Sequence, residues 1–142
     1  MRIIIAGAGE MGSHLAKMLS GNGHDITVVD ADPKLLGDVS SLADVITVEG
    51  DSTTFDTLRK AAVRRCDLFI AVNHEENENI LSAMLAKQLG AKKSIARIDN
   101  NEYLEPNNKE IFIDMGIDYL FYPEKVAARE VINLLGHTST TE

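Results

Sequence analysis

Three glycines and one acidic residue near the start of the chain have types and a spacing suited to binding a phosphorylated ligand. Gly7, Gly9 and Gly12 lie in the stretch IIIAGAGEMGSHLAKML, between a β-branched run and a helical pattern. Asp30 comes 18 residues after Gly12, close to the roughly 20 residues expected in a dinucleotide-binding strand–helix–strand unit. This context, more than the glycines alone, predicts a nucleotide cradle instead of a plain turn.

Each part of this motif has a mechanical role. Gly7 permits a tight turn, Gly9 lets a pyrophosphate approach the backbone, and Gly12 lets the helix pack closely on the strands. The N–H groups around Gly9 to Gly12 and the helix dipole then receive the phosphate charge. Asp30 is suited to both ribose hydroxyls of an adenosine and repels a 2′-phosphate, which favours NAD-type or simple adenine nucleotides over NADP.

Further polar residues follow the later strands, where the ligand crevice of an open parallel sheet lies. Asp51 is suited to an adenine amino group or a ribose, or alternatively to capping a helix. Asn73 and His74 follow the fourth predicted strand. Arg97, in the fifth, is suited to a phosphate, or alternatively to pairing with a surface acid.

The sequence favours binding over turnover. A dehydrogenase needs a proton donor beside the nicotinamide and a place for its substrate, and only His74 lies near the expected crevice. His14 is expected at the surface or an interface, His24 in a solvated turn and His137 in the polar tail. The acidic run 75–78 is expected to favour a helix N-terminus. We therefore assign no catalytic residue and no metal ligand.

Strand-like and helix-like segments alternate along the chain and predict the scaffold for these residues. Several strand-like runs are apolar on successive residues, as expected for strands covered on both faces. The predicted strands are Arg2–Ala6, Asp25–Asp30, Val45–Val48, Leu68–Val72, Ser94–Ile98 and Tyr119–Tyr122. The predicted helices run from Met11 to about Ser20, from Asp32-Pro33 onward, over 76–89 and from Pro123. We predict an α/β fold with a Rossmann-type doubly wound parallel six-stranded sheet, in the order 3-2-1-4-5-6.

Composition and length set the broad class. A chain of 142 residues suits one domain with a real core. The net charge of −8 argues against a nucleic-acid binder. A single cysteine, Cys66, favours a reducing cytoplasm and a buried structural thiol. We expect a nucleotide-binding domain over residues 1–135. The polar tail, 136–142, is expected to be either a solvated terminus or the start of a linker to a missing C-terminal domain.

Additional stretches make the chain resemble the N-terminal nucleotide-binding domain (RCK/KTN, TrkA-N) of Trk-type potassium-uptake regulators over essentially its whole length. The matching stretches after the glycine segment are VVDAD, EGDST, LFIAVNHEENENILSAMLAK, IARIDNNEYL and DMGIDYLFYPEKVAAREVINLL. The last two are the most specific, because ordinary Rossmann dehydrogenases do not share them. The chain departs from the family at Met11, at Asn73 and in the acidic HEEN loop, which leaves the preference between NAD and ATP open.

The resemblance implies a cytoplasmic regulatory subunit that binds NAD(H), or ATP and ADP instead, and gates a membrane potassium transporter. It implies that the segment Gly7 to Met11 holds the pyrophosphate, that Asn73 and His74 line the pocket, and that Arg97 contributes at its far side. With the reasoning above, the predicted cofactor-binding residues are Gly7, Ala8, Gly9, Glu10, Met11, Gly12, Asp30, Asp51, Asn73, His74 and Arg97.

The mechanism expected from these features is a ligand-gated one. Nucleotide binding would bias the relative orientation of subunits in a homo-oligomer, a dimer or tetramer, with the apolar helix 76–89 and the final helix partly at subunit interfaces. We expect a peripheral position at the inner face of the cell membrane through the transporter, no direct membrane insertion and no nucleic-acid partner. The alternative is a fragment of an NAD-dependent oxidoreductase. The basic residues Arg59, Lys60, Arg64 and Arg65 suit a solvated helix end or a partner contact.

Overall fold

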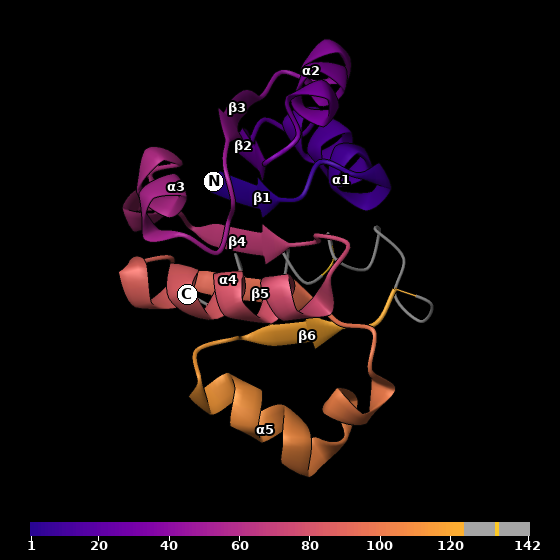
Figure 1. Cartoon of the computed structure of the whole chain (residues 1–142), viewed down its shortest axis with the longest axis vertical. Coiled ribbons are helices and arrows are strands. Elements are labelled where there is room, and N and C mark those ends of the chain that lie inside the picture. The colour runs from indigo at the N-terminus through magenta and orange to yellow at the C-terminus, as the bar shows by residue number, and fades with distance from the viewer. Residues whose placement is uncertain (124–132, 134–142) are drawn as a thin grey trace.

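The computed structural model describes residues 1–123 and 133, which contain a six-stranded parallel sheet with helices on both faces (Figure 1). The strand order β3-β2-β1-β4-β5-β6 confirms the predicted Rossmann-type fold. The strands are β1 (Arg2–Ala6), β2 (Asp25–Asp30), β3 (Ile46–Glu49), β4 (Leu68–Ala71), β5 (Lys93–Arg97) and β6 (Tyr119–Phe121). The α-helices are α1 (Glu10–Ser20), α2 (Pro33–Leu42), α3 (Phe55–Lys60), α4 (Glu76–Leu89) and α5 (Pro106–Asp114). No helix among the described residues is both long and apolar enough to cross a membrane.

The elements predicted within residues 1–123 are present, and two further helices there were not predicted. All six strands lie within one residue of their expected bounds. Helix α2 begins at Pro33 as expected, and Asp32 caps it because Asp32 Oδ1 accepts from Lys34 N at 2.9 Å. Helix α3 is only six residues long, and α5 has no buried residue, so neither has a clear periodic signal. The predicted final helix and the tail 136–142 lie outside the described residues, and the boundary at residue 135 stays a prediction.

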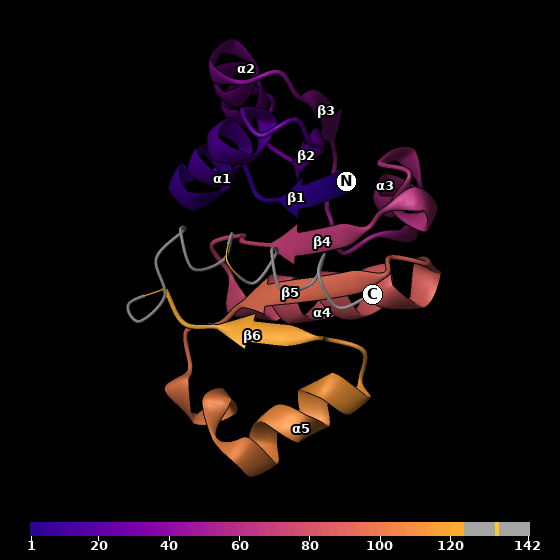
Figure 2. The same ribbon diagram turned by 180° about the vertical axis from the view of Figure 1, so that it is seen from behind.

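Alternate residues of the central strand supply two separate cores. Ile3 and Ile5 pack with buried residues of α1 and α2, whereas Ile4 and Ala6 pack with buried residues of α3 and α4. In Figure 1 α4 lies in front of β5, and in Figure 2 it lies behind it. The sheet is therefore covered on both faces, which is why its strands are apolar at successive positions.

Helix α4 buries small and polar residues directly against the sheet. Its buried residues are Asn79, Ser82, Ala83 and Ala86, which recur at the helical spacing of one face. The larger apolar residues of the helix flank this stripe: Ile80, Met84, Leu85 and Leu89 are partly buried and pack against the core, and Leu81 is 39% exposed. Small side chains along the stripe let the helix approach the sheet closely.

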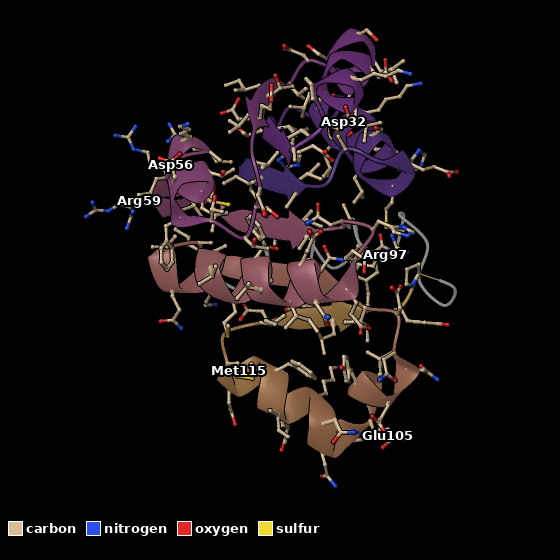
Figure 3. The ribbon with its side chains drawn as sticks, in the orientation of Figure 1. Asp32, Asp56, Arg59, Arg97, Glu105 and Met115 are labelled. Atoms are coloured by element: carbon tan, nitrogen blue, oxygen red, sulfur yellow. The ribbon has the colours of Figure 1, made fainter. Side chains whose placement is uncertain are left out.

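The basic stretch lies at the end of the sheet opposite Arg97, as Figure 3 shows for Arg59. Arg59 and Lys60 form the last turn of α3, where positive charge is favourable. The Arg59 guanidinium lies 5.6 Å from the centre of the Phe55 ring, and Lys60 Nζ lies 3.2 Å from Asp56 Oδ2. These contacts fit the solvated helix end proposed from the sequence.

Cys66 is expected to be unreactive toward Ellman's reagent in the native protein. The residue is 2% exposed, and burial raises the pKa of its thiol to about 12 because the thiolate loses its hydration. Since the thiolate is the reacting species, native protein at neutral pH should release thionitrobenzoate only as it unfolds. The same protein in denaturant should titrate at once with one thiol per chain; an equally fast reaction of the native protein would contradict this burial.

Candidate functional site

A pocket of about 900 Å³ lies where the direction of strand order reverses. Strand β1 pairs with β2 on one side and β4 on the other, and the loops after β1 and β4 diverge there to opposite faces. Ligands of open α/β sheets bind at such a switch point, beyond the carboxyl ends of the strands. The pocket is lined by Gly7, Gly9, Glu10, Met11, His14, Asp30, Leu35, Val72, Asn73, His74, Glu78, Arg97 and Pro123.

The turn from β1 into α1 depends on two glycines for close packing. Gly7 has φ +116°, and a Cβ there would lie 2.8 Å from the Val72 carbonyl oxygen. A Cβ on Gly12 would lie only 1.8 Å from the Gly7 carbonyl oxygen. These approaches confirm the roles assigned from the sequence to Gly7 in the turn and to Gly12 in close packing.

The N-terminus of α1 opens into the pocket beside Gly9. Gly9 is the N-cap residue, no side chain caps the helix, and a Cβ on Gly9 would meet nothing within 4 Å. The first N–H groups of a helix have no partner within the helix, and the helix dipole adds partial positive charge. This end of α1 can therefore donate hydrogen bonds to an anionic group that approaches Gly9.

Asp30 ends β2 and is fixed by the glycine turn. Its Oδ2 accepts from Ala8 N at 2.8 Å, and its Oδ1 accepts from Asp32 N at 2.8 Å. Each carboxylate oxygen has a second lone pair, so both can still accept a ligand hydroxyl. Ala8 does not line the pocket, and its N–H acts on the site by holding this carboxylate.

The far wall of the pocket is formed by the ends of β4 and β5. Asn73 Nδ2 donates to the Oγ of the buried Ser52 at 3.1 Å, which leaves Asn73 Oδ1 as an acceptor. The Arg97 side chain is 24% exposed, and its Nη2 atom lies 3.5 Å from Asp99 Oδ1. Among the described residues, Arg97 Nε has no hydrogen-bond partner although the atom is buried. An unpaired buried donor is costly, and an anionic ligand group would satisfy it.

The structure brings eight of the eleven predicted residues into the pocket lining. The three others are Ala8, Gly12 and Asp51. Asp51 is exposed, and its Oδ1 accepts from Thr53 N at 2.9 Å and from Thr53 Oγ1 at 2.7 Å. The helix-cap alternative for Asp51 does not hold, because Thr54 caps α3.

Several lining residues were not predicted from the sequence. Leu35 lies on the first turn of α2, after the strand that ends at Asp30, so its place after a strand end was an available signal. His14 was expected at the surface or an interface; it is exposed and also lines the pocket, four positions after Glu10 on α1. Glu78 was interpreted only as part of an acidic helix start. Its position in the pocket follows from the way α4 packs at the end of β4.

The residues present fit an adenine nucleotide. The uncapped end of α1 and the unpaired Arg97 Nε suit phosphate oxygens, and Asp30 suits ribose hydroxyls. The open space at Gly9 allows close approach of the phosphates to the backbone. Three carboxylates, those of Glu10, Asp30 and Glu78, line the same pocket, so a ligand with hydroxyl and amino donors beside its phosphates matches it better than a bare polyanion.

Comparison with known sequences identifies relatives over most of the chain. A "Trk system potassium uptake protein TrkA homolog" from Archaeoglobus fulgidus is 42% identical over 137 residues, which are 96% of this chain and 30% of that protein. A protein of the same description from Methanothermobacter thermautotrophicus is 32% identical over 128 residues, 90% of this chain and 57% of that protein. The chain thus spans about a third to somewhat over half of these relatives. Both relatives are named for potassium uptake.

Solved structures share the fold. The TrkA-N domain of the inner membrane protein ybaL from Escherichia coli has a TM-score of 0.74 at 17% identity, covering 94% of this chain and 96% of that one. A structure described as GsuK bound to ADP has a TM-score of 0.69 at 25% identity, covering 96% of this chain and 34% of that one. The GsuK channel bound to NAD has a TM-score of 0.68 at 20% identity, covering 86% and 21%.

The family model described as the TrkA-N domain matches residues 3–123, which include all of the sheet except Arg2 and every residue of the pocket lining. The resemblance read from the sequence is therefore confirmed. This chain belongs to the TrkA-N domain family.

Proposed function

We propose that this domain is the nucleotide-sensing part of a regulatory protein of a potassium uptake system and that it performs no chemistry on the nucleotide. The observation that carries the proposal is one pocket that combines an uncapped helix N-terminus, the Asp30 carboxylate and the unpaired Arg97 Nε. Relatives named for potassium uptake and the ADP- and NAD-bound GsuK structures support NAD(H) or ATP and ADP as ligands.

Within this proposal each part of the pocket has a role. The segment Gly7 to Gly12 receives the phosphates and Asp30 the adenosine ribose. Asn73, through Oδ1, and His74 contact the remainder of the ligand, and Arg97 neutralises phosphate charge from the far wall. Asp51 is left out, because it does not line the pocket.

The proposed regulation acts through assembly. The regulatory protein lies in the cytoplasm, and nucleotide binding shifts the relative orientation of subunits in a homo-oligomer and so gates a membrane potassium transporter. Support comes from large apolar side chains left exposed on two helices: Leu81 of α4, Ile111 and Ile113 of α5, and Met115, which follows α5. Large apolar side chains left exposed on neighbouring segments are consistent with a protein–protein contact.

Calorimetric titration with NADH, NAD, ATP and ADP tests the proposal. We expect saturable binding of at least one of the four with one site per chain, and an unchanged NADH absorbance over hours with added carbonyl compounds. Consumption of NADH would instead support the alternative, a fragment of an NAD-dependent oxidoreductase. Absence of binding by all four nucleotides would contradict the sensor assignment.

A further inference from the structure

We propose that Asn79 is a positioning residue that holds the two polar groups of the far wall, Asn73 and Arg97, in place for the nucleotide. This inference rests on the proposed function, because it concerns the same pocket. Asn79 does not line the pocket and acts only through these two residues.

The Asn79 carboxamide joins the ends of two neighbouring strands. Its Oδ1 accepts from Asn73 N at 2.6 Å, and its Nδ2 donates to Asn73 O at 2.9 Å and to Arg97 O at 3.1 Å. Both backbone groups of Asn73 and the carbonyl of Arg97 are thus bound to one side chain. With three hydrogen bonds the carboxamide uses both of its N–H donors.

Asn79 makes these bonds in a buried position. The residue is 1% exposed on the face of α4 that packs against the sheet. Hydrogen bonds of a buried amide are strong and geometrically restrictive because water does not compete for them. The pairing of β4 with β5 ends at Ala71 and Ala96. Beyond that point, the side chain of Asn79 connects the segments that follow the two strands, in place of strand–strand hydrogen bonds.

The first turn of α4 also binds the segment after Arg97, through exposed hydrogen bonds that Glu76 accepts. Glu76 Oε2 accepts from Asp99 N at 2.5 Å and from Asn100 N at 2.7 Å. On the other side, Ser52 fixes the side chain of Asn73. Asn79 is the group that connects these two arrangements, so its loss frees Asn73 and Arg97 to move independently.

Asn79→Ala and Ser82→Ala form a matched pair for the test. Ser82 is 0% exposed on the same face of α4, and its Oγ donates only to Asn79 O, at 3.3 Å. We expect Asn79→Ala to weaken binding of the preferred nucleotide about 10-fold, as when a buried hydrogen-bonding partner is removed. Ser82→Ala should keep the affinity within about 2-fold, since it removes one long hydrogen bond that does not reach the pocket.

A double-mutant cycle with Arg97→Gln separates positioning from general loosening. If Asn79 acts through Arg97, the double variant should bind the nucleotide only about 2-fold more weakly than the single variant with the lower affinity. The reason is that the free-energy effects of coupled residues do not add. A purely structural role would give independent losses that multiply. Unchanged affinity in Asn79→Ala, or multiplicative losses, would overturn the proposal.

A second variant and an NMR measurement test the same role of Asn79 independently. If Asn79→Ala does not fold, Asn79→Asp replaces it, since aspartate keeps the shape and the acceptor for Asn73 N but has no donor for the two carbonyls. In the unmodified chain, the side-chain NH₂ resonances of Asn79 should shift on nucleotide addition while those of Gln88, exposed at the other end of α4, do not; absence of a shift would contradict the assignment. Failure of the unmodified chain to bind any nucleotide would refute the proposed function and this inference with it.

Discussion

Replacement of Asp30 with alanine should weaken nucleotide binding by about 30-fold, the effect expected when a hydrogen-bonded charged group is lost. The carboxylate would accept the ribose hydroxyls, and it also accepts from Ala8 N, which places it against the glycine turn. Its removal therefore deletes a ligand contact and leaves that N–H without its partner. Calorimetric titration of the variant with the nucleotide that the unmodified chain prefers measures the loss.

Asp32→Ala is the matched control for Asp30→Ala. Asp32 is an exposed aspartate two residues later, and it caps α2 through Lys34 N without lining the pocket. Loss of this cap should lower the free energy of unfolding by about 1 kcal/mol and leave the affinity unchanged. Equal affinity losses in the two variants would mean that the effect is a general one of local stability or charge, and the ribose assignment would be wrong.

Gly12→Ala is expected to lose stability, whereas Gly9→Ala is expected to keep its stability and lose nucleotide affinity. A methyl group on Gly12 would overlap the Gly7 carbonyl oxygen, and overpacking of this severity should reduce the free energy of unfolding by about 3 kcal/mol. A methyl group on Gly9 meets open space, so stability should change by no more than about 0.5 kcal/mol. The same methyl group would occupy the space through which the phosphates approach, and affinity should fall about 10-fold, as when close backbone contact is prevented.

Gly37→Ala provides the reference for this series. Gly37 is exposed within α2, and a Cβ there meets nothing within 4 Å. Alanine should raise the free energy of unfolding by roughly 0.5–1 kcal/mol without any effect on affinity. Chemical denaturation and calorimetry on the three variants separate folding from binding. Normal affinity in Gly9→Ala would remove the argument that phosphates lie against this turn.

The local signals in the sequence were strong where neighbouring residues interact with each other. The glycine spacing, the strand that follows and Asp30 predict a turn whose geometry depends on residues within one strand–helix–strand unit. Apolar runs such as Ile3–Ile5 predict buried strands, because a strand covered on both faces needs apolar residues at successive positions. The strand order follows from the dinucleotide-binding pattern, in which the strand before the glycine turn lies at the centre of the sheet.

Long-range packing determined the rest of the site. The sequence did not distinguish Asp51 from Asn73, since both follow a strand and both are polar. The structure turns the Asp51 carboxylate into its own loop and brings Asn73 to the pocket through Ser52 and Asn79. The Asn73–Ser52 hydrogen bond joins positions 21 residues apart, so no local spacing predicts which polar residue reaches the pocket.

The amino-acid sequence alone determined the parallel sheet, the glycine turn and the acidic end of β2, because each depends on local spacing and on periodic burial. Only the tertiary structure decided which face of α4 is buried and that Arg97 Nε has no partner within residues 1–123. It also decided that Asn79 connects β4 to β5. The physical reason is that burial, close approach and hydrogen-bond pairing depend on side chains brought together from different elements.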